Sequence, residues 1–167
     1  ILDSAVRNLS VNNLVRFGDE ILLREAETNL QYSVVGYSNK IQSTFNDLAT
    51  SPQLHSPVIG WAYDGNPIYG PYGYSEVDNN NSLARVLRSG YDLDTSKVIN
   101  RPNLSEFAAG FFVEDYSFTN SGDLDESNGR FCKTPDFPNG TYAYFAGIST
   151  TTADPVFPYF IGDTYRS

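Results

Sequence analysis

The stretch that decides the fold is His55–Tyr74, HSPVIGWAYDGNPIYGPYGY, which contains the only histidine and the only tryptophan of the chain. Its three prolines each fix φ and remove a backbone donor, while its four glycines allow tight turns. Four tyrosines lie between these turns. This combination predicts a rigid, closely packed loop system that holds His55 and Asp64 in fixed places.

The residues that precede this stretch have the pattern of short strands. Leu14–Phe17 and Glu20–Arg24, joined by a Gly18-Asp19 turn, predict a hairpin, although a helix through residues 19–27 is an open alternative. Leu30–Tyr37 also reads as a strand. The N-terminal part therefore favours β structure.

Three further segments complete the predicted fold. Lys40–Thr50 places three apolar side chains on one helical face and predicts a short helix. Phe107–Tyr116 is the densest apolar run and predicts a core strand, and Gly140–Ile148 alternates aromatic with small residues as a half-buried strand does. We expect a mainly β fold with one or two short helices, arranged as a compact sandwich or irregular barrel with long ordered loops.

Length and charge narrow the classes of function. The 167 residues suit a single domain over 1–167, and no run approaches the roughly 18 apolar residues of a membrane span. A net charge of −9 argues against nucleic acid as a partner and leaves cations or basic surfaces as better ones. Because the chain starts at Ile1 and has no methionine, we expect a fragment of a larger polypeptide.

The acidic loop around residue 125 contains oxygen ligands that a metal ion could use. Asp123, Asp125 and Asn128 follow one another at loop spacing, which suggests calcium as one possible ligand. The EF-hand pattern does not fit, because its twelfth position is Thr134 instead of glutamate. We favour a solvated turn with local hydrogen bonds and expect no cofactor. Cys132 is the single cysteine, and a buried, unreactive thiol is the expected state.

His55 and Asp64 raise the possibility of general-base catalysis, since a carboxylate can orient an imidazole. A nucleophile is missing from the pattern, because Ser56 lies in a Ser-Pro pair and the chain has no G-x-S-x-G motif. A structural histidine is therefore favoured, and an enzyme is the less favoured class.

The tyrosines suggest a second kind of site. Five of them could line a ligand groove, with rings that stack and hydroxyls that bond: Tyr63, Tyr69, Tyr72, Tyr142 and Tyr144. Core packing is the competing interpretation, and in a small β-rich domain it is the favoured one.

Two blocks of this sequence, HSPVIGWAYDGNPIYGPYGY and LDESNGRFCKTPDFPNGTYAYF, closely resemble the YHYH protein family. They occur in the family's order and cover roughly residues 55–145. Ser127 stands where the family has a cysteine, and no histidine-rich element precedes His55. The resemblance extends to modules of bacterial surface proteins and of marine bacteriophage virion proteins, and it implies no assigned reaction.

These observations favour a non-enzymatic structural or binding module of a phage tail or baseplate, or of a cell-surface protein. Its partners would be neighbouring virion or surface proteins or a glycan, and its location the virion or the cell exterior. The alternative is a divalent-cation-dependent glycan-binding or hydrolytic domain. Its site would gather polar residues from both blocks: His55, Asp64, Asp125, Glu126, Asn128 and Arg130.

Overall fold

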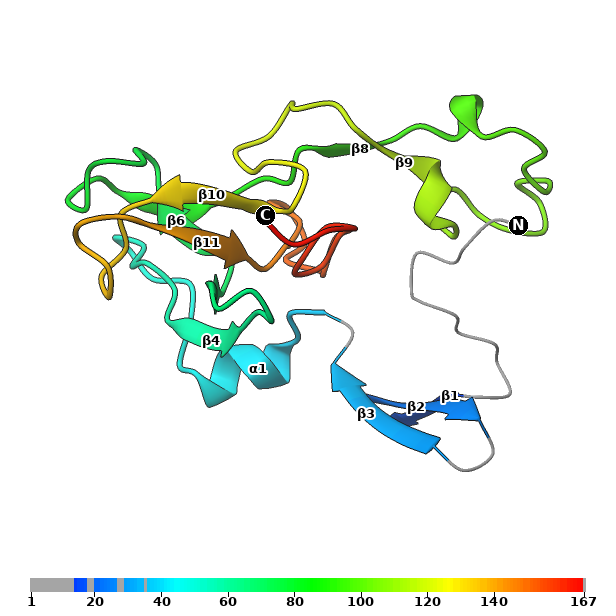
Figure 1. Ribbon diagram of the computed structural model, residues 1–167, viewed down its shortest axis with the longest axis horizontal. Coiled ribbons are helices and arrows are strands. Elements are labelled where there is room, and N and C mark those ends of the chain that lie inside the picture. Colours follow the sequence, from blue (N-terminus) through cyan, green and yellow to red (C-terminus); the bar gives the residue numbers. More distant parts are fainter. Residues whose placement is uncertain (1–13, 18–19, 27–28, 35, 167) are drawn as a thin grey trace. The chain divides into compact units, whose positions relative to one another are not determined.

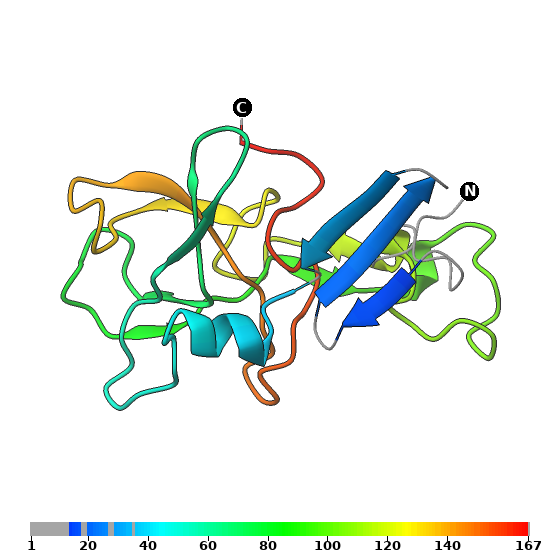
Figure 2. The same cartoon turned by 90° about the horizontal axis from the view of Figure 1, so that it is seen from below.

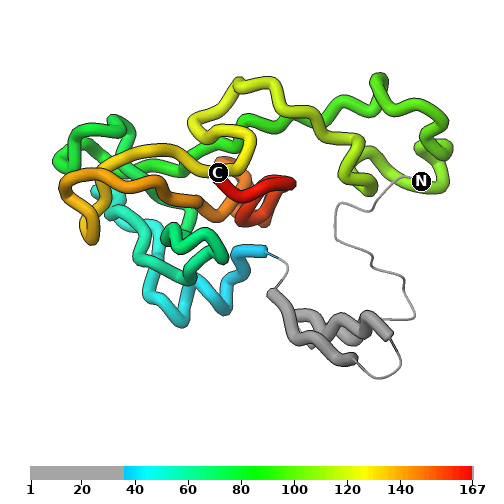
Figure 3. Tube along the Cα trace, in the orientation of Figure 1, coloured from blue at the N-terminus to red at the C-terminus, as the bar shows by residue number. Residues whose placement is uncertain are grey.

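The computed structural model describes residues 14–17, 20–26, 29–34 and 36–166, with side chains from residue 36 onward. Figure 3 draws the part of the chain from residue 36 onward in colour. The chain divides into two compact units, and each is described by itself. One consists of residues 1–35 and 91–119, and the other of residues 36–90 and 120–167. The expectation of a single domain stays a prediction.

A four-stranded sheet organises the unit built from residues 36–90 and 120–167. It contains β4 (Val58–Trp61), β5 (Pro67–Tyr69), β10 (Gly129–Cys132) and β11 (Thr141–Phe145), in the order β10-β11-β5-β4. β11 runs antiparallel to β10, beside which it lies in Figure 1, and parallel to β5. This order brings the two sequence blocks together, because β4 and β5 come from the first block and β10 and β11 from the second.

The predicted loop system of His55–Tyr74 is a series of short strands joined by tight turns. β4, β5 and β6 (Tyr72–Tyr74) lie within it, and β6 pairs with β7 (Ala84–Val86). Gly65 turns the chain between β4 and β5 with φ of +83°, where a side chain would be strained. A Cβ at Gly70 would lie 2.1 Å from Asp47 Oδ2, so only glycine fits there.

β11 is buried on both of its faces, which makes it the centre of the core. Ala143, Tyr144 and Phe145 are each 0% exposed. One face of the sheet packs a cluster formed by Tyr69, Leu87, Leu124, Cys132, Ala143 and Phe145. The other packs Ala62, Tyr142 and Tyr144 against Ile68 and Ile161. The strand predicted for Gly140–Ile148 is confirmed over Thr141–Phe145, where it ends earlier than expected. It is not half-buried, because neighbouring segments cover both faces.

The helix of this unit is shorter than the sequence predicts. α1 spans Asn39–Thr44, and the Ser38 hydroxyl caps it by accepting from the Ile41 amide at 3.3 Å. The prediction through Thr50 is wrong because Asn46 adopts a left-handed φ of 52° and ends the helical path. Leu48, from the predicted apolar face, is consequently 51% exposed.

The N-terminal strands form a small antiparallel sheet, drawn in blue in Figure 2. It contains β1 (Leu14–Phe17), β2 (Glu20–Ala26) and β3 (Asn29–Val34) in sequence order. The two strands of the predicted hairpin are confirmed, and the helical alternative is wrong because β2 pairs with both neighbours. The Gly18-Asp19 turn lies outside the described residues. The predicted strand Leu30–Tyr37 is too long, since β3 ends at Val34.

The remaining segment of this unit contains β8 (Tyr91–Leu93) and β9 (Tyr116–Phe118), which pair antiparallel. Two 3-10 turns, η1 (Thr95–Lys97) and η2 (Val113–Asp115), lie between them. The core strand predicted for Phe107–Tyr116 is wrong. Much of that run is a compact turn, in which Gly110 has φ of +87°.

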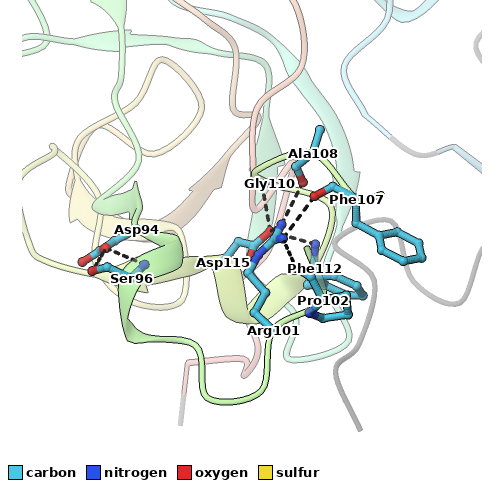
Figure 4. Close-up of polar contacts among 9 residues, drawn as sticks. All are labelled: Asp94, Ser96, Arg101, Pro102, Phe107, Ala108, Gly110, Phe112 and Asp115. Carbon is cyan, nitrogen blue, oxygen red and sulfur yellow. Dashed lines mark hydrogen bonds and ion pairs between the residues drawn. The ribbon is translucent and has the colours of Figure 1, made fainter. Parts of the chain in front are cut away.

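Arg101 and Asp115 hold this turn together (Figure 4). The guanidinium donates to both carboxylate oxygens, from Nε at 2.6 Å and from Nη2 at 2.8 Å. It also donates to the carbonyls of Pro102, Phe107 and Ala108. The Gly110 and Phe112 amides donate to Asp115. A buried ion pair therefore replaces the strand pairing that the apolar sequence predicts.

The fold is mainly β, with one short α-helix and several small sheets among the described residues. The described strands form no closed barrel. In the same part of the chain, no helix is long and apolar enough to cross a membrane.

Candidate functional site

Asp64 lies in the turn between β4 and β5 and contacts β11. One of its oxygens accepts a hydrogen bond from the Asn66 amide at 3.0 Å, and the other accepts one from the Tyr144 hydroxyl. Partial burial acts to raise the pKa of Asp64, but these hydrogen bonds outweigh it and lower the pKa below its ordinary value. Burial, followed by the bond to Asp64, raises the pKa of Tyr144 to about 12. Asp64 is therefore a charged acceptor with a fixed orientation.

Asp125, from the second sequence block, is held by the strand residue two positions before Tyr144. The Tyr142 hydroxyl donates to both carboxylate oxygens of Asp125, at 2.8 and 3.0 Å. The amides of Ser127 and Gly129 also donate to Asp125, at 3.0 and 3.1 Å. Asp125 therefore closes the tight turn that leads into β10.

Arg166 links the two acidic groups. Its amide donates to the Tyr144 hydroxyl at 2.8 Å, and its Nη1 lies 3.4 Å from Asp125 Oδ2. The guanidinium carbon lies 4.7 Å from the centre of the Tyr142 ring. We name Asp64, Asp125, Tyr142, Tyr144 and Arg166 the carboxylate cluster.

Two exposed rings, those of Tyr63 and Tyr165, directly precede Asp64 and Arg166 of the carboxylate cluster in the sequence. Tyr63 is 96% exposed, and its ring centre lies 6.1 Å from that of Tyr165 in an edge-on arrangement. The side chain of Arg166 is 53% exposed and that of Asp125 is 39% exposed. The charges and rings at this place are thus open to solvent.

His55 lies in a different environment. Its Nδ1 is 2.7 Å from the Ser56 carbonyl oxygen, and its ring packs against three others, those of Tyr69, Tyr74 and Phe145. Burial lowers the pKa of His55, because a charged imidazole would lose its hydration there. A neutral ring is consequently the state favoured near pH 7.

Arg130 shares this environment with His55. Its side chain is buried, with the residue 8% exposed, and its guanidinium carbon lies 5.6 Å from the centre of the Phe145 ring. One nitrogen donates to the Tyr74 carbonyl. Two buried nitrogens, Arg130 Nε and His55 Nε2, have no hydrogen-bond partner among the described residues. We name His55, Tyr69, Tyr74, Arg130 and Phe145 the histidine cluster.

The two clusters lie on opposite faces of the four-stranded sheet. Tyr144, which binds Asp64, and Phe145, which contacts His55, are consecutive residues of β11. Consecutive side chains of a strand point to opposite faces. His55 and Asp64 therefore do not converge on one reacting atom. The same alternation separates Asp125, bound to Tyr142, from Arg130.

The other acidic-loop residues occupy separate positions. Asp123 pairs with Arg85 at 2.7 Å, and this bond lowers the pKa of Asp123. Glu126 is exposed, while Asn128 is fully buried and donates to the carbonyls of Phe145 and Phe160. Within the described ranges, no group of three or more His, Cys, Asp or Glu is placed to hold a metal ion.

The five predicted platform tyrosines are mostly core residues. Tyr69, Tyr72, Tyr142 and Tyr144 are between 0% and 7% exposed, and only Tyr63 lies fully at the surface. Three of the four buried hydroxyls, those of Tyr69, Tyr142 and Tyr144, act as hydrogen-bond donors within the chain. That of Tyr69 lies 2.9 Å from both Thr134 Oγ1 and Asp136 Oδ2. Stacking on the four buried rings would require their neighbours to move.

Sequence reasoning missed the contribution of the C-terminal segment. Arg166 and Tyr165 have no motif around them, so no local signal indicates that they lie at the carboxylate cluster. The alternation of Tyr142 and Tyr144 in a predicted strand was a usable signal, because it places both hydroxyls on one face. Cys132 is buried as expected, 1% exposed.

Comparison with known proteins gives one relationship. No curated protein and no solved structure matches the chain. The YHYH protein family matches residues 27–158, which cover most of the chain and include the strands that carry both clusters. The chain therefore belongs to the YHYH protein family.

Proposed function

We propose that this chain is a non-enzymatic structural or binding module of a phage virion, in its tail or baseplate, or of a cell-surface protein. Its location would accordingly be the virion or the cell exterior. Membership of the YHYH family supports a shared architecture. The setting rests on the resemblance of the two sequence blocks to modules of virion and surface proteins.

The observation that carries the non-enzymatic part is the separation of His55 from Asp64. The imidazole faces away from the carboxylate that would orient it, and its Nδ1 contacts the carbonyl of Ser56. The Ser56 hydroxyl is itself buried and accepts from the Tyr72 amide at 2.9 Å. No nucleophile and base are joined here in the way that acyl transfer requires.

The carboxylate cluster supports the binding part. A fully exposed ring at Tyr63 and partly exposed charges at Asp125 and Arg166 offer stacking and charged hydrogen bonds at one exposed surface. Such groups suit either a glycan or the surface of a neighbouring virion or surface protein. Arg166 pairs with one of the two carboxylates, that of Asp125, so this surface presents charges of both signs.

Binding is tested by presenting the chain, tagged at its N-terminus to keep Arg166 clear, to a glycan array and to candidate neighbouring proteins. We expect a ligand whose affinity falls about fivefold in Tyr63→Ala, since one stacking contact contributes roughly 1 kcal/mol. Phe111→Ala, an exposed ring of the other unit, is the matched control and should bind normally. Equal losses in both variants would contradict the proposed surface.

Catalysis is tested with ester, glycoside and peptide substrates. We expect no turnover. Hydrolysis that disappears in both His55→Ala and Asp64→Ala would overturn the non-enzymatic proposal, because it would show that the two residues act together.

The alternative is a divalent-cation-dependent glycan-binding or hydrolytic domain. It is favoured only by the proximity of Asp64 and Asp125 to exposed rings. Calorimetric titration with calcium and zinc separates the two: heat of binding that is lost in Asp125→Asn would support the alternative. Glycan affinity that survives chelation would support the cation-independent surface.

A further inference from the structure

Arg130 carries a buried charge for which the described residues supply no counter-ion. Only one oxygen, the Tyr74 carbonyl, accepts a hydrogen bond from it, and the Cys132 thiol lies beside it. Its Nε is fully buried without a partner. A buried guanidinium without an anion is costly, so unsatisfied groups of this kind call for an explanation.

Arg101 shows how this chain satisfies a buried guanidinium elsewhere. All five of its N–H groups donate, and its Nε and Nη2 edge binds the two oxygens of Asp115. In Arg130 the Nε on the corresponding edge has no partner, and Nη2 donates to the Tyr74 carbonyl. The edge that binds a carboxylate in one arginine is thus unoccupied by any described side chain in the other.

A second unpartnered nitrogen borders the same rings. His55 Nε2 is buried without a hydrogen bond, and the imidazole packs on Tyr74 and Phe145, with ring centres 4.8 and 5.9 Å away. Arg130 contacts the same two residues through the Tyr74 carbonyl and the Phe145 ring. His55 and Tyr74 are both partly exposed, so the histidine cluster reaches the surface of its unit.

We propose that Arg130 and His55 form a binding site for a small carboxylate, or for a carboxylate group of a larger ligand. The guanidinium edge supplies the charged hydrogen bonds, and a protonated His55 Nε2 supplies another. The aromatic walls of Tyr74 and Phe145 exclude water and strengthen these bonds. This site is independent of the exposed surface around Tyr63.

The charged groups around His55 determine how binding depends on pH. Arg130 opposes protonation of the imidazole, while Asp136 and Asp47 favour it. Tyr69 and Tyr74 stay neutral, since burial raises their pKa values further. A bound carboxylate adds a negative charge, which raises the pKa of His55. Carboxylate affinity therefore rises as pH falls from 8 toward 6.

The test is NMR titration of the whole chain with sodium formate, compared with sodium chloride at equal ionic strength. Formate is the smallest planar carboxylate. Because the chain has one histidine, its imidazole signals report on this site alone. We expect saturable shifts of the His55 signals with formate and an increase in its apparent pKa. The proposal would be overturned if the His55 signals did not shift with formate, or if they shifted equally with chloride.

Two arginine variants locate the effect. Arg130→Met should abolish the formate response of His55, whereas Arg85→Met, which removes an exposed arginine paired with Asp123, should keep it. A formate response that persists in Arg130→Met would overturn the site. If Arg130→Met does not fold, the NMR signal of the Arg130 Nε–H group in the wild-type chain is followed instead. This signal should shift with formate and saturate at the same concentration as the His55 signals. A signal that does not shift would overturn the site.

Discussion

Arg101 and Arg130 are both buried arginines, and they differ in what surrounds the charge. Arg101 uses its N–H groups on Asp115 and on three carbonyls of its own loop. Arg130 donates to one carbonyl and stacks on Phe145. Burial alone therefore does not reveal the purpose of a charge. The hydrogen-bond partners do reveal it. A guanidinium whose N–H groups all have partners organises its loop, whereas one with unpartnered N–H groups retains the capacity to bind a ligand.

The difference also shows how each unit is held together. The turn around Arg101 lacks long strands, and its apolar rings Phe107 and Phe111 are partly exposed, with Phe111 at 45%. Ionic and backbone hydrogen bonds consequently carry its structure. The unit around Arg130 has a buried strand at its centre and relies on packing, so it can accommodate a charge whose bonds are incomplete.

Asp115→Ala should have the largest effect on this comparison. Removing Asp115 leaves the Arg101 guanidinium, whose side chain is 7% exposed, without its carboxylate partner, so the free energy of unfolding should fall clearly. Urea unfolding and proteolysis within residues 94–115 are the measurements. Asp94→Ala removes a partly exposed acid that caps η1 and is the control, with a much smaller expected loss. Similar losses in both variants would mean that the Arg101 pair does not organise the turn.

Acid titration sharpens the comparison at His55. Its folded-state pKa is lowered, so the unfolded chain binds the proton more readily below the ordinary value of 6.5. The stability contributed by neutral His55 is present above pH 6.5 and is lost as pH falls through the lowered pKa. Asp115, whose pKa lies below 3.8, keeps its charge just below pH 6.5.

Unfolding free energies at pH 7.5 and 5.5 measure this effect. The wild-type chain should be less stable at the lower pH, and His55→Gln should remove most of that difference. In the wild-type chain, formate should also reduce the stability difference between the two pH values. A wild-type slope that His55→Gln leaves unchanged would show that other groups cause it.

Arg85→Gln should have the smallest effect. Arg85 is an exposed arginine that pairs with Asp123, and its side chain is 45% exposed. Solvent screens such a pair, so we expect a loss of about 0.5 kcal/mol in urea unfolding, decreasing further at high salt. A loss as large as that of Asp115→Ala would show that exposure does not separate these two ion pairs.

Local sequence patterns correctly predicted the strands that have a simple arrangement of apolar residues and turns. The strand at Leu14–Phe17 follows from the hairpin pattern before Gly18-Asp19, and the strand at Thr141–Phe145 follows from alternation. The mainly β class follows from many short strands. The run Phe107–Tyr116 misled, because apolar density does not reveal that Gly110 and Asp115 bend the chain around a distant arginine. Strand propensity reflects only residues that are close in the sequence, whereas this turn depends on the contact between Asp115 and Arg101, 14 residues away.

The residues of the candidate site could be predicted from the sequence, but their positions relative to one another in space could not. Both sequence blocks supply it, and Asp64 and Asp125 do approach neighbouring hydroxyls on β11. Their separation from His55 depends on strand register, which is set by the pairing of β11 with β5 and β10. Arg166 could not be found from the sequence, because its role depends on where the C-terminal segment lies.

The alternation along β11 has a consequence for how this chain can change during evolution. Substitutions at Tyr142 or Tyr144 alter one cluster, while those at Phe145 alter the other, so the two can diverge independently. Insertion or deletion of a single residue within Thr141–Phe145 would instead exchange the partners of both at once. We therefore expect relatives to vary here in residue type and to keep the length of this segment constant.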